Sequence, residues 1–102
     1  MDKKKAIESV KKYIAFLEEQ DFAIRKVYLF GSYVKGNFNE DSDIDLAVVM
    51  NNLANGYLMQ IELMKISRKF DTRIEPHPFA ETDFNLSDPF AHEILTTGIQ
   101  IL

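Results

Sequence analysis

Cysteine and tryptophan are both missing from this chain of 102 residues, and there are only three prolines and four glycines. Without cysteine the chain can form neither a disulfide framework nor a thiolate metal site. No run of about 18 apolar residues occurs, so no membrane-spanning helix is expected. The N-terminal segment MDKKKAIESV is charged and lacks the apolar stretch of a secretory signal. These absences predict a soluble, cytoplasmic protein that does not bind a membrane.

An excess of basic residues is also lacking. The chain carries 12 basic and 16 acidic residues, a net charge of −4 and an isoelectric point near 5.1. Proteins that grip nucleic-acid phosphates usually show a basic patch, so direct binding to nucleic acid is not expected. Internal repeats, low-complexity tracts and linkers are absent from the sequence as well. With 46% hydrophobic residues, residues 1–102 are predicted to fold as one small domain.

Hydrophobic periodicity predicts an alternation of helices and strands. Ile7, Val10 and Ile14 recur at helical spacing, whereas the segment IRKVYLF is rich in the β-branched and aromatic residues of strands. Helices are expected over 3–20, 57–69 and 89–97, strands over 24–30, 43–49, 71–79 and 99–102, and a loop with room for one helical turn over 31–42. This order predicts a small α+β domain, a two-layer arrangement in which one mixed sheet is flanked by helices.

Prolines and glycines indicate where these elements end. Pro76 and Pro78 cannot donate to a ladder, so the third strand is expected to end there or to lie at an edge of the sheet. Ser87 or Asp88, followed by proline, is typical of a helix start, and Gly98 is typical of a helix end.

The segment LFGSYVKGNFNEDSDIDLAVVM, residues 29–50, concentrates acidic side chains. Asp41, Asp43 and Asp45 alternate with other residues, and no basic residue lies among them. Like charges this close repel one another unless a cation lies between them. Asp41 and its neighbour Glu40 are expected to face water, so the charge to be explained is that of Asp43 and Asp45.

Two familiar ligand loops do not fit this segment. GSYVKG has the two glycines of a phosphate-binding loop, but that loop needs lysine and then serine or threonine next, where Asn37 and Phe38 stand. A calcium-binding EF-hand loop that began at Asp41 would need glycine at its sixth position and glutamate at its twelfth. Leu46 and Asn52 occupy those places. Both kinds of loop are excluded.

A third interpretation takes the pieces in chain order: Gly31-Ser32 ends one strand, ten residues follow, and Asp43-Ile44-Asp45 opens the next strand. Carboxylates two residues apart on a strand point to the same face, about 6 to 7 Å apart at their roots. They can converge on Mg²⁺, which takes one or two carboxylates together with phosphate oxygens of a substrate. The Gly-Ser turn offers backbone N–H groups to that phosphate. The segment therefore predicts a site for Mg²⁺ and a polyphosphate.

This pattern resembles the nucleotidyltransferase fold of the DNA polymerase β superfamily, and most closely its minimal nucleotidyltransferase (MNT) branch, the MNT antitoxins. The residues that carry the resemblance are an apolar strand, Gly31-Ser32, Gly36 and Ser42-Asp43-Ile44-Asp45-Leu46. The resemblance implies transfer of a nucleoside monophosphate from a triphosphate, most often ATP, to a hydroxyl. It also implies that Asp43 and Asp45 hold Mg²⁺ and that Gly31 and Ser32 cradle the β- and γ-phosphates. Ser42 is expected to brace the turn and to contribute to the nucleotide site.

The third carboxylate of the family lies on a neighbouring strand, and Asp71 and Glu75 are the two candidates here. Asp71 lies where a helix meets a strand, where a cap or turn role is the simpler explanation. Glu75 lies within the strand, on the face that it shares with His77, and we favour it as a catalytic and metal-binding residue. It would accept the proton of the attacking hydroxyl. His77 itself, between two prolines, is expected to be structural.

The acceptor is expected to come from a partner, because a chain of this length leaves no room for the second domain of kanamycin nucleotidyltransferase-like enzymes. In the MNT family that partner is a helical HEPN-domain toxin, which is modified by AMP transfer to a tyrosine. The first hypothesis is therefore a catalytic antitoxin that uses Mg²⁺ and ATP, alone or within a homo- or hetero-oligomer.

Two alternatives stay open. The chain could be a non-catalytic antitoxin that masks a HEPN partner, with an apolar patch formed by Phe79, Phe84 and Phe90. It could also transfer a nucleotide to a small molecule, although the missing acceptor domain argues against that substrate class.

Overall fold

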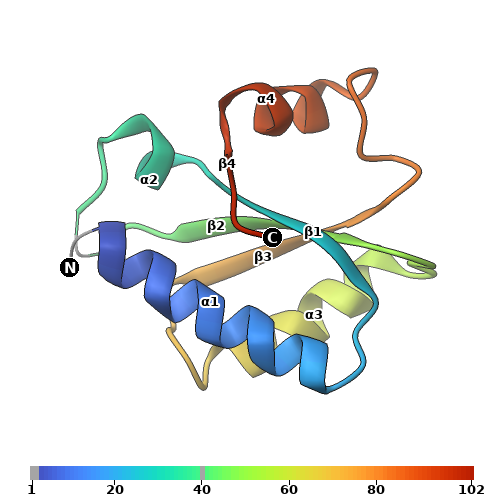
Figure 1. Cartoon of the computed structure of the whole chain (residues 1–102), viewed down its shortest axis with the longest axis horizontal. Helices are drawn as coiled ribbons and strands as arrows, with labels where there is room; N and C mark the ends of the chain where they lie inside the picture. The colour runs from blue at the N-terminus through green and yellow to red at the C-terminus, as the bar shows by residue number, and fades with distance from the viewer. Residues whose placement is uncertain (1–2, 40) are drawn as a thin grey trace.

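The computed structural model describes residues 3–39 and 41–102. Along the chain these residues form α1 (Lys3–Glu19), β1 (Ile24–Phe30), α2 (Ser32–Lys35), β2 (Ile44–Met50), α3 (Gly56–Ser67), β3 (Ile74–Ala80), α4 (Pro89–Thr97) and β4 (Ile99–Gln100). The predicted order of elements is confirmed, and their ends differ from the predicted ones by no more than three residues (Figure 1). The helical turn expected between the first two strands is α2.

The four strands form one mixed sheet with the order β3-β2-β1-β4. Strand β1 is antiparallel to both β2 and β4, whereas β2 and β3 are parallel. The predicted fold class is therefore confirmed. Strand β3 lies at an edge and continues through both of its prolines, Pro76 and Pro78. An edge strand tolerates them because its outer side has no neighbour that needs an N–H donor.

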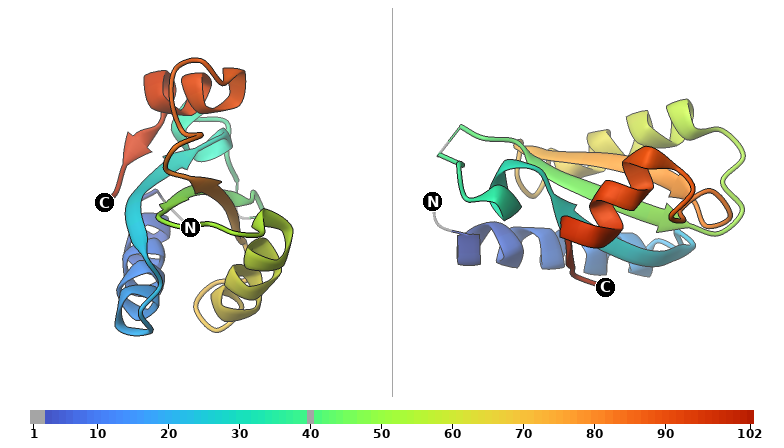
Figure 2. Two further views of the ribbon diagram at one scale, coloured as in Figure 1. Left: turned by 90° about the vertical axis from the view of Figure 1, so that its right-hand side faces the viewer. Right: turned by 90° about the horizontal axis from the view of Figure 1, so that it is seen from above.

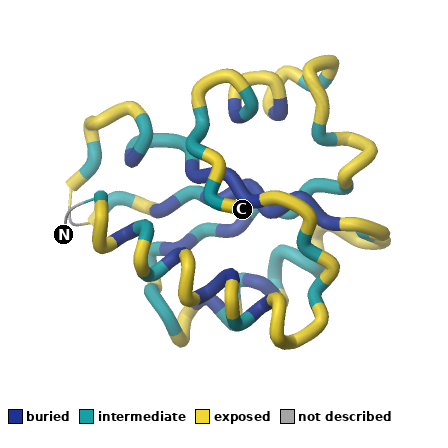
Figure 3. The backbone as a smooth tube through the Cα atoms, viewed as in Figure 1, coloured by how far each residue is buried: buried dark blue, intermediate teal, exposed yellow. Residues whose placement is uncertain are grey.

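Helices cover both faces of the sheet. Helices α1 and α3 pack under one face, and α4 lies over the other (Figures 1 and 2). The alternation of β2 sorts its side chains accordingly: Leu46 joins the core with α1 and α3, whereas Ala47 packs with Tyr28 and Ile94 on the α4 side. Burial is concentrated in the central strands and on the inward sides of the helices (Figure 3). Residues at odd positions of β2 therefore face α4.

Helices α1 and α3 are tied together by a buried tyrosine. The hydroxyl of Tyr13 donates a hydrogen bond to the carbonyl oxygen of Leu63 over 2.8 Å. Burial raises the pKa of the Tyr13 phenol above its usual range, because the phenolate would lose its hydration there. This hydrogen bond links α1 to α3 under the sheet.

The helix signals around α4 are confirmed in part. Asp88 is the N-cap, since its side chain accepts a hydrogen bond from the backbone N–H of Ala91 over 3.1 Å. Gly98 ends the helix, but with an extended backbone (φ −75°) that any residue can adopt. A side chain there would instead meet the carbonyl oxygens of Ile94 and Leu29 at 2.6 and 3.0 Å. Glycine is therefore needed because α4 turns back so closely onto β1.

None of the helices in the described part of the chain is long and apolar enough to cross a lipid bilayer.

Candidate active site

The first part of the site is the sharp turn after β1. Gly31 adopts φ 80° and ψ −147°, and its carbonyl oxygen accepts hydrogen bonds from the backbone N–H groups of Val34 and Lys35 over 3.0 and 3.1 Å. A β-carbon added at Gly31 would overlap a carboxylate oxygen of Asp45 and lie 3.3 Å from its Cγ. Glycine is therefore required twice, by its left-handed backbone and by the carboxylate packed against it.

The second part of the site is a row of residues on adjacent strands. Asp45 of β2 is paired with Phe30 at the end of β1 and with Glu75 of β3. Asp43 precedes β2 by one residue and His77 follows Glu75 by two. By the alternation of strands, Asp43, Asp45, Glu75 and His77 all lie on the face that α4 covers. The sheet register thus brings together side chains that are 30 residues apart in the chain.

Asp45, Glu75 and His77 form a cluster with the separations of a metal site. One ligand atom from each lies within 4.8 Å of the others. The Nε2 atom of His77 is 3.4 Å from Oδ1 of Asp45. All three side chains are half-buried. Carboxylate oxygens and an imidazole nitrogen at these distances fit a divalent cation.

Asp43 reaches the same cluster through Glu75. Burial is the main cause that raises the pKa of the Glu75 carboxyl above its usual value, and a hydrogen bond with the Asp43 side chain adds to it. The negative charges of Asp43 and Asp45 raise that pKa further, while His77 opposes the shift. The three carboxyls that we predicted as ligands therefore lie close enough to interact, and a cation would relieve their repulsion.

Asp71, the other candidate for the third carboxylate, is engaged elsewhere. Its Oδ2 lies 2.6 Å from Nη2 of Arg73, and its Oδ1 accepts from Nε of Arg73 over 2.9 Å and from the backbone N–H of Arg73 over 3.0 Å. Arg73 also donates to the hydroxyl of Tyr33 over 3.2 Å. This bidentate ion pair closes the turn before β3. It agrees with the cap or turn role that was the simpler explanation of Asp71.

Replacing Asp71 with asparagine should destabilise the fold at neutral pH by about 1 to 3 kcal/mol, because the substitution removes the charge-assisted hydrogen bonds between Asp71 and Arg73. The Arg73 guanidinium lowers the pKa of Asp71, so the stabilisation is complete above the unfolded-state pKa of about 3.9. It is lost as the pH falls through the lower, folded-state pKa. Urea unfolding at pH 7 and at pH 3 measures this, and equal stability of the two proteins at pH 7 would contradict it.

The remaining predicted residues lie around the turn. Ser32 begins α2, and Ser42 braces the loop, since its Oγ accepts from the backbone N–H of Asn39 over 2.8 Å. This hydrogen bond agrees with the predicted role of Ser42 in bracing the turn. A contact between Ser42 and a nucleotide stays a prediction. Asp41 is exposed, as expected. Glu40 lies outside the described residues.

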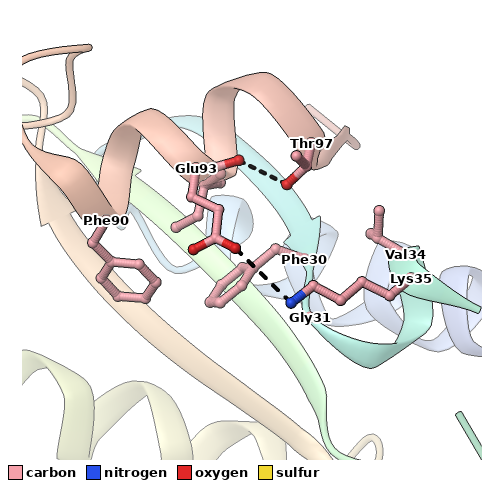
Figure 4. Close-up of a pocket in the computed structure, with 8 residues that line it drawn as sticks. Phe30, Gly31, Val34, Lys35, Phe90, Glu93 and Thr97 are labelled. Atoms are coloured by element: carbon pink, nitrogen blue, oxygen red, sulfur yellow. Dashed lines mark hydrogen bonds and ion pairs between the residues drawn. The ribbon is translucent and has the colours of Figure 1, made fainter. Parts of the chain in front are cut away.

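A pocket of about 180 Å³ lies beside the turn, between the end of β1, α2 and α4 (Figure 4). Nζ of Lys35 and Oε1 of Glu93 are 3.9 Å apart across its mouth, and both side chains are mostly exposed. The volume is below that of most small-molecule sites, so the pocket suits one ring-sized group and not a whole nucleotide. Its walls are Phe30, Gly31, Val34, Lys35, Phe90, Glu93, Ile94 and Thr97.

Residues 11–102 match the protein family described as "Polymerase beta, Nucleotidyltransferase". The chain belongs to the polymerase β nucleotidyltransferase family. The resemblance inferred from the Gly-Ser and Asp-x-Asp pattern is thereby confirmed, together with the predicted enzyme class. A curated protein of Methanocaldococcus jannaschii, provisionally named a protein adenylyltransferase, is 29% identical over 80 residues, which cover 74% of this chain and 77% of that protein.

Solved structures of this nucleotidyltransferase fold include three similar ones. A crystal structure from Sulfolobus solfataricus, provisionally named a nucleotidyltransferase, superposes with a TM-score of 0.67 at 16% identity, over 96% of this chain and 80% of that one. A toxin–antitoxin structure with AMP-PNP gives 0.65 at 22% identity, over 94% and 72%. The toxin–antitoxin MntA–HpeT mutant D39ED41E gives 0.60 at 20% identity, over 100% and 73%. At these identities the likeness establishes the fold.

The position of His77 was not anticipated from the sequence, in which this residue was expected to be structural. The signal was present in part, because strand alternation puts His77 on the same face as Glu75. What the sequence lacked was the parallel register that sets β3 beside β2 and so brings His77 to Asp45.

Proposed function

We propose that this nucleotidyltransferase transfers AMP from ATP to a hydroxyl of a partner protein, with Mg²⁺ held by Asp43, Asp45 and Glu75. The observation that carries the proposal is the meeting of three carboxyls from adjacent strands beside a glycine turn that touches one of them. Family membership supports the reaction class, and the provisional name of the archaeal relative supports a protein acceptor.

The residues of the chain divide the work of this reaction. Asp43 and Asp45 hold the cation, which when bound offsets negative charge on the triphosphate. Gly31 and Ser32 present backbone N–H groups to the β- and γ-phosphates. Glu75 takes the proton of the attacking hydroxyl as the new oxygen–phosphorus bond forms and pyrophosphate leaves. Its burial and its acidic neighbours raise its pKa in the metal-free protein, whereas a bound cation would lower it, so correct positioning would supply most of the rate.

We further propose that the partner is a helical HEPN-type toxin, that the acceptor is a tyrosine hydroxyl, and that the chain acts as the antitoxin in the cytoplasm. Two structural neighbours are toxin–antitoxin structures, one of them with AMP-PNP. A partner that supplies the acceptor also agrees with a pocket of only about 180 Å³ beside the turn. Assembly with the partner would make the working form a hetero-oligomer.

The test is incubation of the protein with ATP labelled on the α-phosphate, Mg²⁺ and the protein encoded beside it. Label should appear on the partner and be stable to denaturation, and intact-mass spectrometry should find the added mass of AMP. Asp43→Asn should abolish the label. Asp41→Asn is the matched control, since Asp41 is exposed in the same loop, and it should label the partner like the wild type.

A second function, stoichiometric masking of the partner, is favoured by one exposed aromatic residue. Phe90 is 44% exposed on α4. Phe79 and Phe84 are half-buried and pack against each other, with ring centroids 5.0 Å apart. The exposed part of the predicted apolar patch of Phe79, Phe84 and Phe90 is therefore smaller than expected. If Asp43→Asn and the wild type label the partner equally little and both neutralise it, masking is the function.

A further inference from the structure

The cluster of Asp45, Glu75 and His77 contains a nitrogen ligand that the proposed Mg²⁺ site does not use. We propose that His77 is a metal ligand and that, with Asp45 and Glu75, it makes a site for a first-row transition cation of the Mn²⁺ class. The inference extends the proposed function, because it concerns cation selectivity at the same carboxylates.

The first argument is the contact between His77 and Asp45. Nε2 of His77 lies 3.4 Å from Oδ1 of Asp45. In one tautomer Nε2 donates its N–H to this oxygen, and in the other its lone pair is available to a cation that the carboxylate also binds. Ligand atoms about 2.1 Å from one metal, at angles between square and tetrahedral, lie about 3.0 to 3.4 Å apart. The observed separation of 3.4 Å therefore fits two ligand atoms on one cation, so His77 needs no rearrangement to bind a metal together with Asp45.

The second argument is that the imidazole is held in position. The His77 ring packs against Phe30 with centroids 5.3 Å apart and against Phe90 at 6.3 Å. Its backbone lies between two prolines, whose fixed φ angles and restriction of the preceding residue keep this stretch extended. A ligand fixed before the metal arrives loses little conformational entropy on binding.

The third argument is the position of His77 within the sheet. On β2 the residue paired with His77 is the buried Ala47, and Asp45 is paired with Glu75. The imidazole of His77 therefore has the small side chain of Ala47 beside it. The carboxylates of Asp45 and Glu75 form the next residue pair on the same face, toward the Gly-Ser turn. All three ligand atoms lie within 4.8 Å of one another, and each residue is half-buried, so a cation can enter from solvent.

The kinds of ligand atom in this cluster determine which cation it prefers. Mg²⁺ prefers oxygen ligands, whereas imidazole adds affinity for Mn²⁺, Co²⁺ and Zn²⁺. Two carboxylates and one imidazole therefore favour a transition cation over Mg²⁺. His77 would be a determinant of metal selectivity, which is a role separate from the proton transfer that we assign to Glu75.

The test is pulsed electron paramagnetic resonance of Mn²⁺ bound to the nucleotide-free protein, combined with a Mn²⁺ titration. The wild type should show modulation from a directly bound nitrogen-14 nucleus. His77→Gln should lose that modulation and bind Mn²⁺ at least about tenfold more weakly. His92→Gln is the matched control, because the only other histidine of the chain lies exposed on α4. It should retain both the modulation and the affinity.

A second measurement needs no folded His77 variant. Protein grown with nitrogen-15 histidine should replace the nitrogen-14 modulation with that of nitrogen-15, and should do so equally in His92→Gln. Wild type that binds no Mn²⁺, or binds it without nitrogen modulation, overturns the inference, as does modulation that persists in His77→Gln. A nitrogen-bound Mn²⁺ in a protein that transfers no AMP would refute the proposed function alone, and AMP transfer without nitrogen coupling would refute this inference alone.

Discussion

Replacing Glu75 with glutamine should lower the rate of AMP transfer by about 10²- to 10⁴-fold at saturating Mg²⁺ and ATP, the usual contribution of a positioned general base. The amide keeps the size of the side chain but cannot accept the proton of the attacking hydroxyl. Initial rates of label transfer to the partner measure the effect. Transfer at more than half the wild-type rate would contradict the role that we propose for Glu75.

The same substitution should stabilise the metal-free protein at neutral pH. In the folded chain the pKa of Glu75 is raised, first by burial and then by Asp43 and Asp45, so ionising this carboxyl costs free energy. That cost is absent below the unfolded-state pKa of about 4.3 and complete above the folded-state pKa. Glu75→Gln should therefore raise the unfolding temperature at pH 7 and leave it unchanged near pH 3, as measured by circular dichroism in a chelating buffer.

Asp71→Asn is the control for Glu75→Gln, and its expected effects on stability and on transfer are the opposite ones. Asp71 is the other carboxylate considered for the catalytic role, and its contacts are with Arg73. Its loss should reduce stability while AMP transfer per folded molecule stays near the wild-type rate. If Asp71→Asn abolished transfer at a temperature where the protein remains folded, the choice between the two carboxylates would have to be reversed.

Replacing Gly31 with alanine should damage both the site and the fold. The backbone at φ 80° and ψ −147° is nearly restricted to glycine, and a non-glycine residue there costs about 1 to 3 kcal/mol. The new methyl group would also displace the Asp45 carboxylate, whose Cγ would lie 3.3 Å from it. A shift of about 1 Å in a metal ligand is enough to lower AMP transfer by about 10²-fold.

Gly36→Ala is the matched control for Gly31→Ala. Gly36 is also left-handed, with φ 87°, but no described atom lies within 4 Å of an added β-carbon. It should cost about 1 kcal/mol of stability and leave transfer per folded molecule unchanged. Urea unfolding and label transfer, measured on both variants, separate the backbone penalty from the displacement of Asp45. Equal losses of transfer in the two variants would mean that contact with Asp45 is unimportant.

The fold could be predicted closely because its signals are local. Strand β1 and helix α4 have the predicted bounds, since a β-branched run that ends at glycine and an Asp-Pro helix start act over a few residues. The Gly-Ser turn and the Asp43 and Asp45 pair were recognisable for the same reason. Gly98 shows the limit of such signals, because its glycine is required by carbonyls of α4 and β1 and not by its own backbone angle.

The sequence by itself determined the elements, the apolar and polar faces of each strand, and the pair of aspartates beside a glycine turn. All of these follow from the covalent order of residues and the period of a strand or helix. Tertiary structure decided which distant side chains meet that pair. The parallel register of β2 and β3 sets Glu75 beside Asp45 and brings Nε2 of His77 to 3.4 Å from Oδ1 of Asp45. Asp71 forms an ion pair with Arg73 instead. Register depends on the packing of the whole sheet between α1, α3 and α4, and no short stretch of sequence encodes it.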